Sequence, residues 1–314
     1  MTLKFFIGLA SFSIGMFAIL LNLLIFIPVF RLAFVSKKST IYIIAFFNII
    51  SDLFQLFITG FHLSASIMAD RYVLSGERFN DLSVFLGFLF CYGWYLESLV
   101  QMVMAANRFV VITLKNNYVF TVQNTMILFV FVNALAVLIA MGNEYLLPCC
   151  QFIADHEVMA YTLNTIEGIY PYTNLLILLN DIVSTVVSII LYILIFNTIR
   201  TAHKTAPEKV KALRAHQDIK YLFHFVFISI FYIFTWVSFE VLPFIVPVDQ
   251  PQWFGVIPCL VALNCSSNPI IYLTMNREVQ KLVPISWIRE RLVKGASSSA
   301  VNPSNPKNTK DTTN

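Results

Sequence analysis

Residues 5–30 read FFIGLASFSIGMFAILLNLLIFIPVF, 26 consecutive residues without a charged side chain, and this stretch decides the fold class. A membrane-spanning helix needs about 20 apolar residues. The apolar core of a cleavable signal peptide is shorter, at about 7 to 15 residues. We therefore expect residues 5–30 to form a first membrane span that the mature protein retains.

The same bias extends outward through the whole chain of 314 residues, of which 58% are hydrophobic and 12% are charged. Soluble domains carry about twice that share of charged residues. Apolar runs long enough to span a bilayer occur near residues 5–30, 40–68, 82–107, 121–143, 174–199, 219–246 and 254–275. The expected fold is an all-α membrane protein, a seven-transmembrane helix bundle.

We expect residues 1–283 to form this bundle together with a short membrane-surface helix after Asn276. Residues 284–314 form a tail, disordered after about residue 295 because its composition cannot bury an apolar core. Of the 21 Lys and Arg residues, 18 fall in alternate loops and the C-terminal segment. Positive residues near span ends stay in the cytoplasm, so the sequence predicts an outside N-terminus and a cytoplasmic C-terminus.

Polar side chains inside the spans mark candidate sites, because a charge in the bilayer costs several kcal/mol. At about 1.5 Å per residue, one layer of the bundle can contain Asn22, Asp52, Glu97 and Asn268, and we include Asn264 in this cluster. Two carboxylates there need water, a shared proton or a cation such as sodium between Asp52 and Glu97. The alternative is that each side chain caps a local backbone hydrogen bond.

Two further acids, Asp181 and Glu240, would either line an outward-facing cavity or extend to the outer headgroups. On the third span, Phe90, Trp94 and Glu97 are spaced to share the face of Arg108. This aromatic face is either packing or the wall of a pocket. The candidate ligand-binding residues are Phe90, Trp94, Asp181, Trp236 and Glu240.

Several of these residues form a pattern. The sequence NPIIY at residues 268–272 resembles the NPxxY motif of rhodopsin-like G protein-coupled receptors, and NRF at residues 107–109 stands where that superfamily has Asp-Arg-Tyr. Asn22 and Asp52 occupy matching places in spans one and two. Within the superfamily, MAANRFVVI and NPIIYLTMNREVQKL are most similar to nematode serpentine chemoreceptors of class x.

The resemblance implies a chemosensory receptor of the plasma membrane, with sensory cilia as a candidate location. Such a receptor binds a small molecule from the outer side and activates a heterotrimeric G protein. For coupling, the resemblance suggests that Arg108 pairs with Asp218 across spans three and six, although Asp218 is also one turn from Arg214. Tyr192 and Tyr272 are expected to move towards Arg108 when the spans rearrange.

The chain departs from the superfamily at its cysteines. Ser83 stands where a span-three cysteine is expected, and Cys91 lies about 12 Å deeper along the helix. A disulfide from Cys91 to Cys149 or Cys150 is therefore not expected. A bond between the adjacent Cys149 and Cys150 would be strained, which leaves free or intermolecular thiols open.

A secondary transporter or a ligand-gated cation channel using the intramembrane carboxylates is the main alternative, because Asp52 and Glu97 lie near the bilayer midplane. Transporters also show repeated halves with interrupted spans, which this sequence lacks. An enzyme is the least favoured class, since no nucleophile, base and orienting group occur at workable spacing. No CxxC or HxxxH metal pattern occurs, and we expect no cofactor and no nucleic-acid partner.

Overall fold

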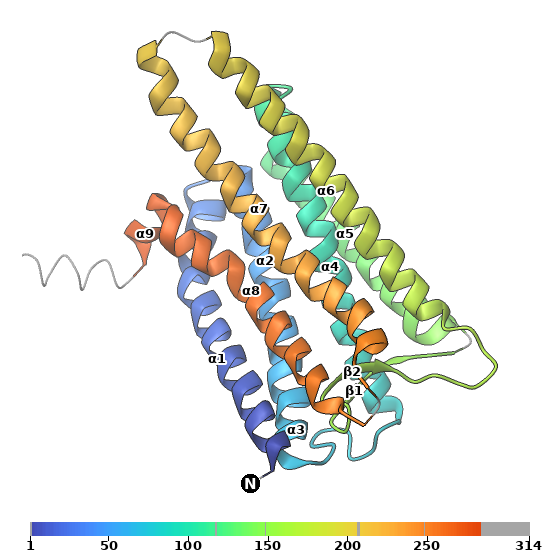
Figure 1. The fold of residues 1–314 in the computed structure, drawn as a ribbon. Coiled ribbons are helices and arrows are strands. Elements are labelled where there is room, and N and C mark those ends of the chain that lie inside the picture. Colours follow the sequence, from blue (N-terminus) through green and yellow to red (C-terminus); the bar gives the residue numbers. More distant parts are fainter. Residues whose placement is uncertain (1, 117, 148, 206–207, 248, 284–314) are drawn as a thin grey trace, which may run out of the picture.

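The computed structural model describes residues 2–283, apart from residues 117, 148, 206–207 and 248, and describes the backbone alone for the other residues of 202–225. Within this part of the chain, seven helical segments are long and apolar enough to cross a membrane. They pack side by side as one bundle (Figure 1). The prediction of seven spans is confirmed, with ends that differ from the predicted ones by a few residues.

The bundle is built from long helices, several of which end in a turn of π-helix. In chain order these are α1 (Leu3–Phe30) with η1 (Arg31–Val35), α2 (Thr40–Ile58) with η2 (Thr59–Ser64) and α3 (Ala65–Ala69), α4 (Asp81–Ile112), α5 (Val122–Met141) with η3 (Gly142–Leu146), α6 (Tyr172–Thr205), α7 (Glu208–Ile245), η4 (Pro251–Gly255), a 3-10 helix, α8 (Val256–Met275) and α9 (Arg277–Leu282).

Helix α4 lies centrally, in contact with α2, α5 and α6. Its start is set by a capping box, in which the Ser83 backbone N–H donates to Asn80 Oδ1 at 2.8 Å and the Asn80 backbone N–H donates to Ser83 Oγ at 2.9 Å. These contacts satisfy donors that the first turn of a helix leaves without partners. Ser83, which stands in place of the superfamily cysteine, therefore has a local structural role.

A β-hairpin of β1 (Phe152–Asp155) and β2 (Ala160–Leu163) lies at the end of the bundle that also holds the N-terminus, and we call this the hairpin end (Figure 1). The hairpin reaches α4 at Gly87, where an added Cβ atom would overlap the carbonyl oxygen of Phe152. Glu144 also holds the hairpin in place beside α4, because the Phe152 backbone N–H donates to its carboxylate oxygens at 3.1 and 3.2 Å. Only glycine permits this approach of strand to helix.

The structure corrects one expectation about the cysteines. Cys149 and Cys150 are joined by a disulfide with each other, where we left free or intermolecular thiols open. Cys150 adopts a left-handed φ of 80°, and this tight backbone turn brings the two neighbouring side chains together. Cys91 is a free buried thiol, 3.4 Å from Glu144 Oε1.

The short helix α9 follows α8 at the opposite end, which we call the α9 end (Figure 1). Asn276 caps it, since its Oδ1 accepts from the backbone N–H groups of Glu278 at 3.0 Å and Val279 at 3.2 Å. Val279 is fully buried in the core of the bundle. This residue packs α9 against α8 and α1.

Candidate functional site

A cavity of about 330 Å³ opens at the hairpin end, between α4, α6, α7, α8 and the hairpin. Aromatic side chains form a large part of its walls: Phe90, Trp94, Tyr95, Phe152, Tyr161, Phe239, Phe244 and Phe254. The rings of α4 and the hairpin form one continuous stack. Tyr161 stacks on Phe90 at 3.9 Å between ring centroids and on Phe152 at 5.5 Å. The hairpin therefore completes a wall that α4 begins.

The acid Asp181 lies in this wall with only 1% of its surface exposed. Its carboxylate accepts from the Tyr232 hydroxyl at 2.6 Å, the Trp94 indole Nε1 at 3.0 Å and the Asn180 amide at 3.1 Å. All three donors are neutral groups. The second acid, Glu240, is half-buried and accepts from the Asn174 amide at 3.4 Å.

Four of the five residues that the sequence suggested for ligand binding line this cavity, namely Phe90, Trp94, Asp181 and Glu240. Trp236 is not among the lining residues, and its indole instead donates to Thr185 Oγ1 at 3.2 Å. Sequence reasoning missed the hairpin rings. A strand pair of four residues each is too short for alternation to identify it in a loop.

A buried polar cluster lies deeper in the bundle, on α2, α4 and α8. Asp52 Oδ2 accepts from Asn48 Nδ2 at 2.9 Å and from Asn268 Nδ2 at 3.2 Å. Asp52 is fully buried. Asn268, from the NPxxY-like sequence, and Asp52 are thus in direct contact.

Glu97 forms the other half of this cluster. Its carboxylate accepts from Asn264 Nδ2 at 2.6 Å and from Gln55 Nε2 at 2.7 Å. Ligand atoms of Asp52, Glu97 and Cys265 all lie within 4.8 Å of one another. The two carboxylates therefore share one site, and each is held by side-chain amides.

Among the described residues, Asn22 makes no hydrogen bond to either carboxylate. Its amide donates to the backbone carbonyls of Cys265 at 2.9 Å and Ala18 at 3.0 Å. Asn22 therefore joins α1 to the α8 backbone beside the cluster. Sequence reasoning missed Asn48 and Gln55, each on the same helical face as Asp52, at positions four before and three after it.

A hollow of about 300 Å³ lies at the α9 end, and its lining includes Arg108 and Tyr272. Lys38, Tyr42, Asn276 and Glu278 also line it. Tyr192 is buried on α6 and lies near Arg108. The side chain of Asp218 lies outside the described residues, so its suggested pairing with Arg108 is a matter for experiment.

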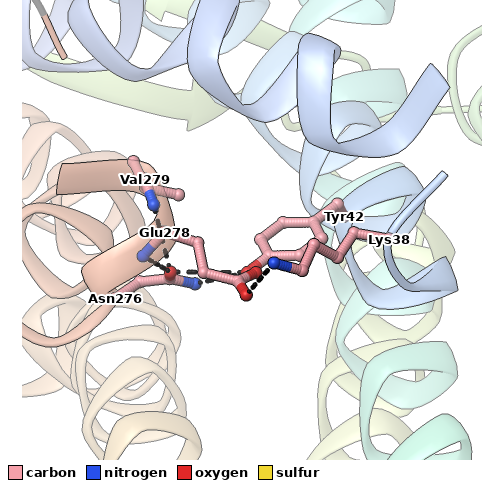
Figure 2. Close-up of polar contacts among 5 residues, drawn as sticks. All are labelled: Lys38, Tyr42, Asn276, Glu278 and Val279. Carbon is pink, nitrogen blue, oxygen red and sulfur yellow. Dashed lines mark hydrogen bonds and ion pairs between the residues drawn. The ribbon is translucent and has the colours of Figure 1, made fainter. Parts of the chain in front are cut away.

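Figure 2 shows the polar contacts among four of the residues that line this hollow. Lys38 Nζ lies 2.7 Å from Glu278 Oε1, and the Tyr42 hydroxyl donates to Glu278 Oε2 at 2.7 Å. The Asn276 amide donates to the Tyr42 oxygen at 3.1 Å. The hydrogen bond from Lys38 holds the pKa of the Glu278 carboxyl below its usual value, and the bond from Tyr42 acts in the same direction. We call these four residues the α9 latch.

Comparison with known structures supports the arrangement of the helices. The crystal structure of squid rhodopsin superposes with a TM-score of 0.72, covering 96% of this chain and 92% of the rhodopsin chain at 12% sequence identity. At this identity the likeness shows the fold alone. No curated protein matches the sequence.

Comparison with protein families identifies the chain more closely. Residues 12–272 match the family described as "Serpentine type 7TM GPCR chemoreceptor Srx". This range spans most of the 314 residues and contains the aromatic helix face, the polar cluster and the NPxxY-like sequence. The chain is therefore a multi-pass membrane protein that belongs to the Srx family of serpentine chemoreceptor G protein-coupled receptors.

Proposed function

We propose that this receptor detects a small molecule in the aromatic cavity and activates a heterotrimeric G protein at the α9 end. The observation that carries the proposal is the cavity at one end of the bundle and the hollow with Arg108 at the other. The excess of positive loops supports an outside hairpin end and a cytoplasmic α9 end. The receptor then acts at the plasma membrane, in sensory cilia where the cell has them.

The switch at the α9 end consists, in this proposal, of Arg108, Tyr192, Tyr272 and Asp218. Arg108 and Tyr272 already line one hollow. A ligand that binds one packing of the bundle more tightly shifts the population towards it. Opening of the hollow would then expose Arg108 to the G protein, with Asp218 holding the closed state.

We further propose that the polar cluster holds a sodium ion or shares a proton between Asp52 and Glu97. Oxygen atoms are the ligands that hard cations prefer. Several buried oxygens of the cluster lack a hydrogen-bond partner in the described structure, among them Asp52 Oδ1, Asn264 Oδ1 and Asn268 Oδ1. If sodium binds there, replacing it by N-methylglucamine lowers the melting temperature of the wild-type receptor but not that of Asp52→Asn. Equal melting temperatures in both salts would favour the proton.

The receptor function is tested in cells that carry a promiscuous G protein and a calcium reporter. Asp218→Ala is expected to raise signalling without ligand, whereas Asp249→Ala, at an exposed position of the opposite end, leaves it unchanged. An N-terminal epitope should be accessible without permeabilisation. Unchanged basal signalling in Asp218→Ala would reject the proposal that Asp218 holds the closed state. A ligand-evoked current that persists without any G protein would favour the channel instead.

A further inference from the structure

We propose that the ligand of the aromatic cavity is a small organic cation, an amine or quaternary ammonium group carried on a compact apolar body. The inference rests on the proposed role of this cavity as the ligand site. It is drawn from three properties of the walls: their charge, their rings and one buried hydroxyl group.

The charge of the walls is uncompensated. Among the described residues, those that line the cavity include two carboxylates, Asp181 and Glu240, and no lysine or arginine. The hydrogen bonds to Asp181 come from neutral indole, phenol and amide groups. A charge buried without an opposite charge is costly. A ligand ammonium supplies that charge, whereas a ligand carboxylate would add a third negative group.

The rings suit the same ligand. A cation is attracted to an aromatic face when it lies within about 6 Å of the ring centroid, and tryptophan is the strongest such face. Phe239 meets Trp94 at 5.9 Å and Phe152 at 6.1 Å between centroids. Because the Trp94 indole is held by Asp181 at 3.0 Å, ring and carboxylate are fixed relative to each other. A cation beside them interacts with both.

The Tyr95 hydroxyl is a polar group in the wall that a ligand in the inner part of the cavity can satisfy. Tyr95 lines the cavity, is fully buried, and its hydroxyl has no hydrogen-bond partner in the described structure. Buried polar groups are almost always paired, so a polar atom of the ligand is a natural partner. The volume of about 330 Å³ is at the lower end of ligand pockets. It favours an amine with one or two rings.

Matched probe molecules test this inference on the purified full-length receptor in nanodiscs at pH 7. One set is tryptamine, the alcohol tryptophol and the acid indole-3-propionate, and a second is phenethylamine, 2-phenylethanol and 3-phenylpropionate. We expect at least one amine to bind at least tenfold more tightly than its alcohol and its acid. The absence of such a preference in both sets overturns the inference.

Variants locate the preference in the cavity. Glu240→Gln should weaken binding of the preferred amine at least fivefold and leave its alcohol unchanged, and its single contact of 3.4 Å makes misfolding unexpected. Phe239→Leu should weaken the amine more than the alcohol. Glu77→Gln removes an exposed carboxylate of the same end and serves as the control. If Glu240→Gln and Glu77→Gln bind the amine equally well, the cavity is not its site and the inference fails.

The two proposals fail in distinguishable ways, because binding is measured without a G protein. Tight binding of an acid or alcohol together with G protein activation rejects the cation and keeps the receptor function. Amine binding that depends on Glu240, without G protein activation in cells, supports the cation and contradicts the receptor function.

Discussion

The two ends of the bundle handle a carboxylate in opposite ways. At the hairpin end, Asp181 is 1% exposed and its hydrogen bonds come from neutral donors. At the α9 end, the Glu278 side chain is 39% exposed and pairs with Lys38. The α9 latch therefore supplies its own positive charge, whereas the cavity does not. This difference is expected if the carboxylate at the α9 end is paired within the protein and the carboxylate at the hairpin end is paired by a bound ligand.

The largest effect should follow from separating the hairpin from α4, which disrupts the structure at the hairpin end and leaves the contacts at the α9 end unchanged. In Gly87→Ala the new methyl group overlaps the Phe152 carbonyl oxygen, a backbone atom that cannot rotate away. We expect a loss of about 3 kcal/mol of stability and of ligand binding. Thermal unfolding of the solubilised receptor measures the first. Gly15→Ala, where a Cβ atom meets nothing within 4 Å, is the control, and equal unfolding of the two variants would contradict the close approach.

The next effect sharpens the contrast between the two acids of the cavity. Asp181→Ala leaves the buried Trp94 indole without its acceptor and removes the shorter of the two hydrogen bonds of the Tyr232 hydroxyl, at a cost of roughly 2–3 kcal/mol. Glu240→Ala removes one contact of 3.4 Å from a half-buried group and should cost less than about 1 kcal/mol. The melting temperatures of the two variants measure whether the loss of stability is larger for Asp181→Ala than for Glu240→Ala. A larger loss for Glu240→Ala would show that the hydrogen bonds from Trp94 and Tyr232 to Asp181 contribute little to stability.

The seven helices of the architecture could be predicted from the sequence, because the length of an apolar run is a strong signal for a membrane span. The seven spans followed from apolar runs alone. Asp52 and Asn268 were predicted to share a layer, since depth along a helix is a simple count of residues. The depth of a residue along its helix does not predict which neighbouring helix its side chain faces. Asn22 lies at a suitable depth but turns towards the α8 backbone.

Tertiary contacts account for what the sequence could not reveal. The role of Glu144 depends on a hairpin that no periodic pattern predicts. Trp236 is close in sequence to the cavity residues Phe239 and Glu240, but its indole donates to Thr185 instead. The latch joins Lys38 to Glu278, which are 240 residues apart in the chain. Long-range ion pairs between exposed residues leave no signature in a single sequence.

A smaller effect is expected at the rim of the hairpin end, where the protein does supply counter-charges. Arg78 pairs at 2.8 Å with Asp155, whose side chain is 1% exposed, while Lys4 pairs at 2.8 Å with the 55% exposed Asp70. Arg78→Met should cost about 1–2 kcal/mol, because a buried carboxylate loses a charged partner. Lys4→Met should cost at most about 0.5 kcal/mol. Thermal unfolding measures both, and equal losses would show that burial of Asp155 does not matter.

The smallest effect concerns the α9 latch and depends on pH. Because Lys38 lowers the folded-state pKa of Glu278, the pair contributes stability above the ordinary glutamate pKa of about 4.3. That contribution is lost as the pH falls through the lower, folded-state value. Acidification from pH 7 to pH 5 should therefore leave the latch closed. Both side chains are partly exposed, so the pair is worth less than about 1 kcal/mol.

Lys38→Met should raise the pKa of Glu278 towards the ordinary range, although the Tyr42 hydroxyl still donates to it. The carboxyl resonance of Glu278, assigned by its disappearance in Glu278→Gln, reports this titration in receptor with labelled glutamate. Lys37→Met, which removes the neighbouring charge outside the pair, is the matched control. If Lys38→Met and Lys37→Met shift the titration equally, general charge rather than the ion pair holds the carboxylate. The two ends of the bundle would then differ less in their electrostatics than the geometry indicates.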